Sequence, residues 1–445
     1  MGLFDLFKKK EDNSPAKENV EKAREHYSKG EYQETLGALI QGFRNDVNYL
    51  PLYQLAVDSL GKLSAANEQK LFEAVCKNQN NSNAYHDLAN FYFNVEHYDL
   101  AQVFLNKTLQ LNPNNNEAIH DLAICYARKF QINKAIEILE NANVSDFWNL
   151  FFLNKCKILD KRIDGVQESI TELLSFLEKQ PDQDAVFFPK MKVYELQESL
   201  LRYNTIPVIQ NHIRDWQFIQ YGGVILDYFE TEENDYVAGG RYVASWGSHE
   251  SIKKVVLKLK QFIDRLAIPI QEVVSLNDRD SEIIGKLIAK ELNLQFSFYN
   301  SSNVNQNCLI VSSDSSNFRD YEELNTIKNG QVVFSVNHNW LDASYIAPDI
   351  IGFMTQTYSF PWNGGGLRMT DTETRELENI PPDNRVADEI VTDIYSNQIE
   401  IEDIANLLDF YADRKEYLKS IGNKTNNYRY NFMIESPVAG AYFGY

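Results

Sequence analysis

Two polar loops in the C-terminal half of the chain hold the side chains best suited to chemistry. One follows the apolar run 272–276, and the other follows the run 308–311. Carboxylates and hydroxyls can hydrogen-bond a sugar, and a guanidinium can pair with a phosphate. The candidates for a small phosphate-containing ligand are Asp278, Arg279, Asp280, Ser281, Ser313, Asp314, Ser315 and Ser316, with Arg368 from the glycine-rich loop 362–368. The same residue types cap helix N-termini, so capping alone is the alternative for both loops.

The elements that must position these loops alternate between strands and helices from about residue 204 onward. Strands are expected at 240–246, 272–276, 295–299, 308–313 and 331–336, with a further strand hairpin at 218–229. Helices are expected at 249–267, 281–293, 318–328, 386–397 and 402–421. This alternation predicts an α/β domain with a mostly parallel sheet over residues 205–445. In such a sheet, ligands bind beyond the carboxyl ends of the strands, which is where both polar loops fall.

The order of the two loops resembles the type I phosphoribosyltransferase fold over roughly residues 240–340. The runs "EVVSLNDRDSEIIGKLIAKELNL" and "CLIVSSDSSNF" occupy the places of that family's first strand–loop–helix and its phosphate-gripping loop. The resemblance implies a ribose-phosphate site at 312–317. That family's loop has two adjacent acids, hydroxyl residues and a glycine, whereas this chain has only Asp314 and no glycine there. The departure favours a binding or structural module over transferase activity, so no catalytic residue is assigned and enzymatic activity stays open.

The N-terminal half contains two stretches that match at a shift of 34 residues. The matching residues are Tyr85, Leu88, Ala89, Tyr92, Ala101 and Leu105 in the first stretch and Ile119, Leu122, Ala123, Tyr126, Ala135 and Leu139 in the second. Large apolar residues three or four apart, with small residues where helices approach closely, are typical of antiparallel helix pairs. A fixed period of this length predicts stacked supersecondary units.

The pattern resembles the tetratricopeptide repeat, most clearly over residues 82–142. Flanking segments match less well, so an all-α helical solenoid is expected over residues 15–204, with atypical terminal repeats. The resemblance implies a groove, lined by the first helix of each repeat, that binds a partner protein or peptide. The groove positions that the family implies are Asn83, His86, Asn90, Asn94, Glu117, His120 and Arg128. The alternative is a solvated face that binds nothing.

Composition narrows the class of protein further. The 445-residue chain has a formal net charge of −20, which argues against nucleic-acid binding because phosphate contacts need clustered Lys and Arg. The segment from Asp371 to Asp413 carries 13 acidic residues and two basic ones, and forms either a solvated surface or a docking face for a basic partner. Four dispersed cysteines and seven dispersed histidines show no metal-ligand spacing, so neither a metal nor a cofactor is expected.

The chain shows neither a secretory signal nor an apolar run long enough for a membrane helix, and a cytoplasmic location is expected. Residues 1–14 are expected to form a mobile tail, in which "LFDLFKKK" could touch a membrane surface only weakly. The sequence therefore favours a cytoplasmic adaptor that captures a partner protein or peptide through its repeats. The alternative is a phosphoribosyltransferase-like enzyme, or a nucleotide- or phosphate-sensing domain, that the repeats recruit to its target.

Overall fold

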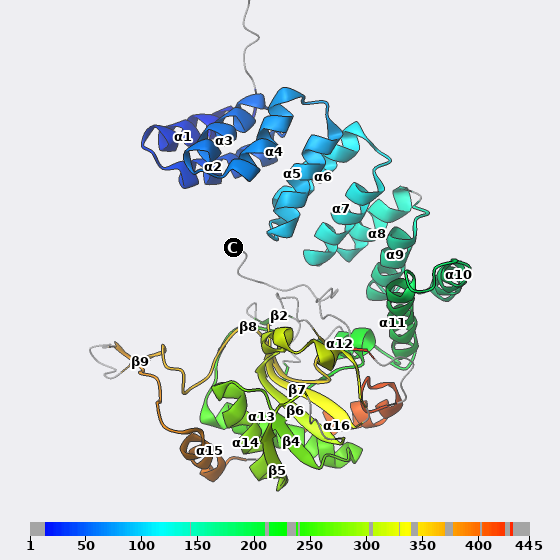
Figure 1. Ribbon diagram of the computed structural model, residues 1–445, viewed down its shortest axis with the longest axis vertical. Helices are drawn as coiled ribbons and strands as arrows, with labels where there is room; N and C mark the ends of the chain where they lie inside the picture. The colour runs from blue at the N-terminus through cyan, green and yellow to red at the C-terminus, as the bar shows by residue number, and fades with distance from the viewer. Residues whose placement is uncertain are drawn as a thin grey trace, which may run out of the picture. The chain divides into compact units, whose positions relative to one another are not determined.

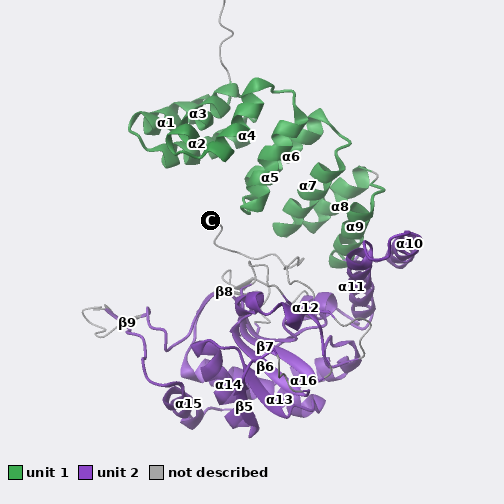
Figure 2. Ribbon diagram, viewed as in Figure 1, with its two compact units in different colours: residues 1–160 green, residues 161–445 purple. Residues whose placement is uncertain are grey.

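The computed structural model describes residues 14–142, 144–209, 213–228, 237–238, 241–301, 306–328, 330–339, 346–369, 377–400, 403–422 and 428–429. The chain divides into two compact units, residues 1–160 and residues 161–445 (Figure 2). The predicted N-terminal tail lies outside the described residues, except for Ser14. The domain boundary expected near residue 204 stays a prediction.

The first unit consists, in its described part, of helices in antiparallel pairs (Figure 1). The helices are α1 (Lys17–Ser28), α2 (Tyr32–Asn45), α3 (Leu50–Lys62), α4 (Ala66–Lys77), α5 (Ser82–Asn94), α6 (Tyr98–Leu111), α7 (Asn116–Arg128), α8 (Ile132–Asn141) and α9 (Phe147–Leu159). Each odd-numbered helix up to α7 packs on the helix that follows it, and each pair packs on the next pair. The predicted all-α solenoid of tetratricopeptide type is therefore present, and it includes the segments that match the repeat pattern poorly.

The turn inside each pair has the same geometry in all four pairs. Gly30, Ser64, Glu96 and Phe130 adopt left-handed φ values of 79°, 59°, 62° and 58°. In each turn the next residue's N–H donates to the carbonyl five residues earlier, as Glu31 does to His26 at 3.1 Å and His97 does to Tyr92 at 2.9 Å. This bond satisfies a free carbonyl at the end of the first helix, as in a Schellman motif. The repeat period is thus visible in the backbone where side chains no longer show it.

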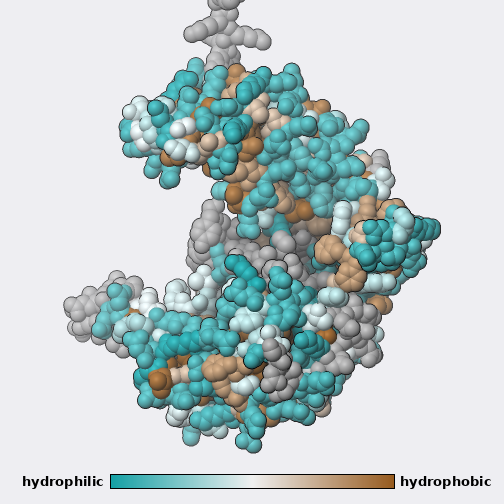
Figure 3. All heavy atoms as spheres, in the orientation of Figure 1, coloured by the Kyte–Doolittle hydropathy of each residue, from teal (hydrophilic) through white to brown (hydrophobic). Residues whose placement is uncertain are grey.

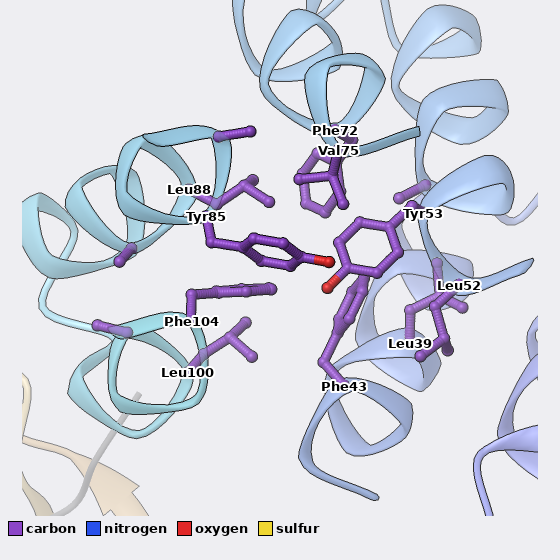
Figure 4. Packing of buried hydrophobic residues seen from close by; sticks show 14 of the residues in the cluster. Leu39, Phe43, Leu52, Tyr53, Phe72, Val75, Tyr85, Leu88, Leu100 and Phe104 are labelled. Carbon is purple, nitrogen blue, oxygen red and sulfur yellow. The ribbon is translucent and has the colours of Figure 1, made fainter. Parts of the chain in front are cut away.

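Aromatic rings from successive pairs form the centre of the first unit's core (Figure 4). Phe43 of α2 lies 4.9 Å from the ring of Tyr53 in α3 and 5.4 Å from that of Phe104 in α6, measured between ring centroids. Tyr53 in turn lies 6.1 Å from Tyr85 in α5. All four side chains are buried. Because these rings belong to different repeats, their contacts bind the repeats to one another.

The second unit begins with helices and continues with a sheet. Its helices are α10 (Val166–Glu178), α11 (Phe187–Tyr203), α12 (Ile213–Tyr221), α13 (His249–Leu266), α14 (Arg279–Leu292), α15 (Ala387–Ser396) and α16 (Ala405–Ala412). Its strands are β1 (Val224–Ile225), β2 (Val237–Ala238), β3 (Arg241–Trp246), β4 (Glu272–Ser275), β5 (Gln295–Phe298), β6 (Cys308–Asp314), β7 (Gln331–His338), β8 (Ile350–Ser359), β9 (Leu367–Met369) and β10 (Leu377–Asn379). Short 3₁₀ helices are η2 (Ser315–Asp320), η3 (Glu322–Asn325) and η4 (Lys415–Tyr417).

The main sheet has the order β2-β3-β8-β7-β6-β4-β5, with β1 also paired to β8. All of its pairs are parallel except β2 with β3, so the predicted mostly parallel sheet is confirmed. Taken in chain order, β4 to β8 follow the arrangement 2-1-3-4-5 of a doubly wound fold. Such a sheet has a topological switch point between its first and third strands, which are β4 and β6 here. Both polar loops of the sequence analysis leave the sheet at this point.

Three expected elements differ from the structure. The helix expected at 402–421 is shorter in its described part, where α16 ends at Ala412 and the 3₁₀ turn η4 follows. Residues 218–221 belong to helix α12 and not to a strand hairpin, because the glycines at 222 and 223 end a helix and lead directly into β1. The expected helix at 318–328 is replaced by the short 3₁₀ turns η2 and η3. There Phe318 and Leu324 are buried in a core cluster with residues of β4, β6 and β7, so packing on the sheet takes precedence over continuous helix.

Candidate functional sites

The first-helix positions of the two clearest repeats are linked by a hydrogen bond between α5 and α7. His86 is buried, and its Nε2 lies 3.4 Å from Oδ2 of Asp121 on the next first helix. That bond raises the pKa of His86 above its ordinary value, burial opposes the shift, and the charges of Asp121, Glu117 and Asp87 add to the rise. Three carboxylates from two adjacent first helices therefore act on one imidazole.

The corresponding histidine of the next repeat makes a different contact. His120 Nδ1 lies 3.1 Å from Oδ1 of Asn149 in α9, and its ring packs against Phe152 at 5.5 Å between centroids. Asn149 is buried and also donates to the carbonyl of Asn116 at 3.2 Å. The histidine–carboxylate contact between α5 and α7 is therefore replaced by a histidine–amide contact between α7 and α9.

The remaining predicted groove residues differ in exposure. Asn83, Asn94 and Glu117 are exposed, while Asn90 and Arg128 are half-buried. The structure thus brings His86 into contact with its neighbouring helix and leaves the amides of α5 largely accessible. In Figure 3 the visible surface of the repeat unit is mostly hydrophilic, with hydrophobic residues in small patches.

Sequence reasoning missed Asp87 and Asp121, which lie beside His86. A signal was present, because the run His-Asp-Leu-Ala occurs at 86–89 and again at 120–123, one period later. In the structure each histidine contacts the first helix of the next pair, since His86 of α5 contacts Asp121 of α7 and His120 of α7 contacts Asn149 of α9.

At the switch point of the α/β unit, residues from both polar loops form one hydrogen-bonded group. Asp278 caps α14 by accepting from the N–H of Ser281 at 2.8 Å. Ser281 Oγ accepts from the N–H of Ser313 at 2.8 Å, and Ser313 Oγ donates to Asp278 at 3.3 Å. Asn317 Nδ2 donates to both Asp278 and Ser313. The predicted residues do meet, and their polar atoms bond to one another.

Asp314 belongs to a second group, at the ends of β6 and β7. Its carboxylate accepts from Ser316 N–H at 2.9 Å, which caps η2, and from Asn337 Nδ2 at 2.7 Å. Ser315 Oγ lies 2.5 Å from Nδ1 of His338, whose burial lowers its pKa to about 3. This histidine is therefore neutral at physiological pH.

Arg279 and Asp280 bind two later loops. Arg279 donates to the carbonyls of Asp383 and Arg385. Asp280 accepts from Trp362 Nε1 at 2.6 Å and from the Asn363 amide at 2.8 Å. These contacts hold the base of the glycine-rich loop against the start of α14. The predicted Arg368 lies in β9, and its side chain is outside the described part of the structure.

Solved structures similar to this chain are tetratricopeptide proteins. The protein YrrB, described as a TPR protein with an unusual peptide-binding site, is 16% identical with a TM-score of 0.25, over 42% of this chain and 94% of its own. MamA from Desulfovibrio magneticus is 19% identical with a TM-score of 0.25, over 38% and 97%. A thermophilic TPR protein from Thermus thermophilus is 14% identical with a TM-score of 0.25, over 40% and 98%.

No protein-family model matches the sequence, and no curated protein matches it either. Because the TM-scores are low, the repeat architecture stands on this chain's own helix pairs and recurring turns. The fold and sites define a protein with a tetratricopeptide-type helical solenoid followed by an α/β unit with a mostly parallel sheet. None of its described helices is both long and apolar enough to cross a membrane.

Proposed function

We propose that this protein is an interaction adaptor whose repeat unit binds a partner protein or peptide along its first helices. The observation that carries the proposal is the series of four helix pairs with one turn geometry, which presents first helices at regular intervals. On α5 the amides of Asn83, Asn90 and Asn94 can bond a peptide main chain without fixing its sequence. His86, Glu117, His120 and Arg128 complete the proposed surface.

Site-specific photo-crosslinking tests this proposal. A photo-reactive amino acid at Asn94, exposed on first helix α5, is compared with the same residue at Asn106, exposed on second helix α6. In extract from the native cell, we expect a discrete protein adduct from position 94 and none from position 106. Equal labelling from both positions, or none from position 94, would count against a first-helix binding surface.

A second candidate function is a small-ligand sensor in the α/β unit. The strand order favours it, because it brings Asp278, Ser281 and Ser313 to the topological switch point, where ligands of doubly wound sheets bind. The hydrogen bonds among these residues would have to open to admit a ligand. Ribose 5-phosphate and ADP are the probes, and a saturable rise in melting temperature of the full chain is the expected result. Absence of a shift with both would reject this candidate for those ligands.

A further inference from the structure

We infer that strand β5 is a self-association edge, at which the chain pairs antiparallel with β5 of a second copy about a two-fold axis at Ser297. The inference is independent of the proposed adaptor function, because it concerns the sheet of the α/β unit. A dimer of this kind carries two repeat units, so it would bind a paired or repeated partner bivalently.

β5 is the last strand at one end of the main sheet (Figure 1). Among the described residues it pairs only with β4, so one side of its backbone has no partner strand there. Gln295 and Phe298, its first and last residues, are exposed, and Phe298 is 48% exposed in spite of its large apolar ring. An edge strand presents unpaired N–H and C=O groups with which another strand can pair.

This edge lacks the charges that normally prevent sheet edges from pairing. The 22 residues from Leu292 to Ser313 include no Asp, Glu, Lys or Arg, in a chain of which 24% of residues are charged, and no other uncharged stretch of the sequence is as long. At the other end of the sheet, four acids at 230–235 come just before β2. Two copies that each have a net charge of −20 therefore meet least repulsion at β5.

Two charged groups that contact β5 are bonded within the chain. Lys286 of α14 lies 5.7 Å from the centroid of the Phe296 ring and pairs with two carboxylates, at 2.8 Å and 2.9 Å. Glu272 of β4 accepts from the Ser297 hydroxyl at 2.5 Å. These internal bonds favour an uncharged strand as the occupant of this edge over a strongly basic or acidic one.

A second copy of β5 fits the edge because the strand is complementary to itself in the antiparallel direction. Phe296 and Phe298 project from the same face of the sheet, and their ring centroids lie 5.3 Å apart. With the two-fold axis at Ser297, Phe296 of each copy lies opposite Phe298 of the other. Aromatic pairs across antiparallel strands stabilise a sheet, and the symmetry forms two such pairs at once.

Sedimentation velocity of the full-length chain over a concentration series tests the inference. We expect the wild-type chain to shift from monomer to dimer as its concentration rises. Gln295→Glu/Phe298→Glu should remain monomeric, because it places carboxylates from both copies along one edge. As a matched control, Gln167→Glu/Phe176→Glu makes the same two changes at exposed positions of α10 and should dimerise like the wild type.

Two results of this experiment would overturn the inference. A wild-type chain that stays monomeric at every concentration would leave the β5 edge to a strand of another protein. The same behaviour of both glutamate variants would show that β5 is not the site of association. Neither result bears on the adaptor function, which the crosslinking from position 94 tests separately.

Disulfide trapping tests the register without adding charge. In a Cys76→Ser background, which removes the one native cysteine that is not buried, Ser297→Cys should form a disulfide-linked dimer on oxidation. Directly opposed Cα atoms of antiparallel strands lie about 4.5–5.5 Å apart, which a disulfide can span. Phe298→Cys is the control and should not crosslink, because each copy's residue 298 lies opposite residue 296 and out of reach of its counterpart. Equal crosslinking at both positions, or none at 297, would reject the proposed pairing.

Discussion

The repeat unit and the α/β unit are held together over very different distances along the chain. In the repeat unit the hydrogen bond between His86 and Asp121, which links two repeats, joins residues 35 apart. In the α/β unit, Lys419 donates to Glu198 across 221 positions, and Arg202 donates to the carbonyl of Tyr417 across 215. A solenoid is therefore stabilised by contacts between neighbouring repeats, whereas the α/β unit needs distant segments to meet.

A buried ion pair joins distant segments of the α/β unit. Arg429 is buried and donates to the carboxylate of Asp349 and to the carbonyls of Leu324 and Gln331. Asp349 also accepts from the N–H of Val333 at 2.7 Å. A residue near the end of the chain thus holds the amino ends of β7 and β8. Substitutions in each unit test whether the two units are stabilised separately.

The largest effect is expected from Arg429→Met. This variant leaves Asp349 buried without its main cationic partner, which typically costs about 3–5 kcal/mol of unfolding free energy. In guanidinium unfolding, the transition of the α/β unit should move to a lower denaturant concentration. The transition of the repeat unit, followed by its helical signal, should not move. Adding Asp349→Asn removes the stranded charge and should restore part of the stability. As control, Arg265→Met breaks the exposed pair with Asp409 and should cost at most about 1 kcal/mol.

A cavity in the core of the repeat unit should destabilise that unit and not the α/β unit. Phe104→Ala removes a buried ring that packs on Phe43 and stacks on Tyr92 at 5.6 Å between centroids, so we expect a loss of about 3 kcal/mol. Limited proteolysis should then cleave within α3–α7 before the α/β unit. Val95→Ala, at a half-exposed position of the neighbouring turn, is the control and should have little effect. If proteolysis cleaves both units at the same rate, the two units are not stabilised separately.

Substitutions at equivalent positions of the recurring turns should change the stability of the repeat unit in opposite directions. Glu96→Gly relieves a left-handed conformation that costs a non-glycine residue about 1 kcal/mol, so it should stabilise the repeat unit. Gly30→Ala should destabilise it by a similar amount, through backbone conformation alone, because nothing lies within 4 Å of the added methyl. Urea midpoints measure both variants. The same sign for both would refute a shared turn geometry.

The smallest effect is a pH dependence at the contact between repeats. Because the pKa of His86 is raised in the folded state, its contribution to stability is fully present below its ordinary value of 6.5 and is lost as pH rises through the folded pKa. A double-mutant cycle with His86→Gln and Asp121→Asn should therefore give a larger coupling energy at pH 6 than at pH 9, of about 1 kcal/mol or less. A coupling independent of pH would show that the contact is not charge-assisted.

Local patterns were sufficient to predict most of the elements. The 34-residue period placed the two clearest repeats, and the helix expected at 281–293 is observed as α14 over Arg279–Leu292. The errors fell where tertiary packing decides, at α12 and at the 3₁₀ turns after β6. For the candidate sites, the resemblance to the tetratricopeptide repeat implied the first-helix positions His86 and His120, and the repeated His-Asp run could also have indicated Asp87 and Asp121.

By itself, the sequence determined the helix pairs of the solenoid, the alternation of strands and helices after residue 204, and the excess of negative charge. These properties depend on residue spacing and composition, which are local. Only the tertiary structure decided that β4 and β6 are neighbours and that Arg429 is paired with Asp349. Both facts join segments whose separation along the chain carries no periodic signal, so they follow from packing alone.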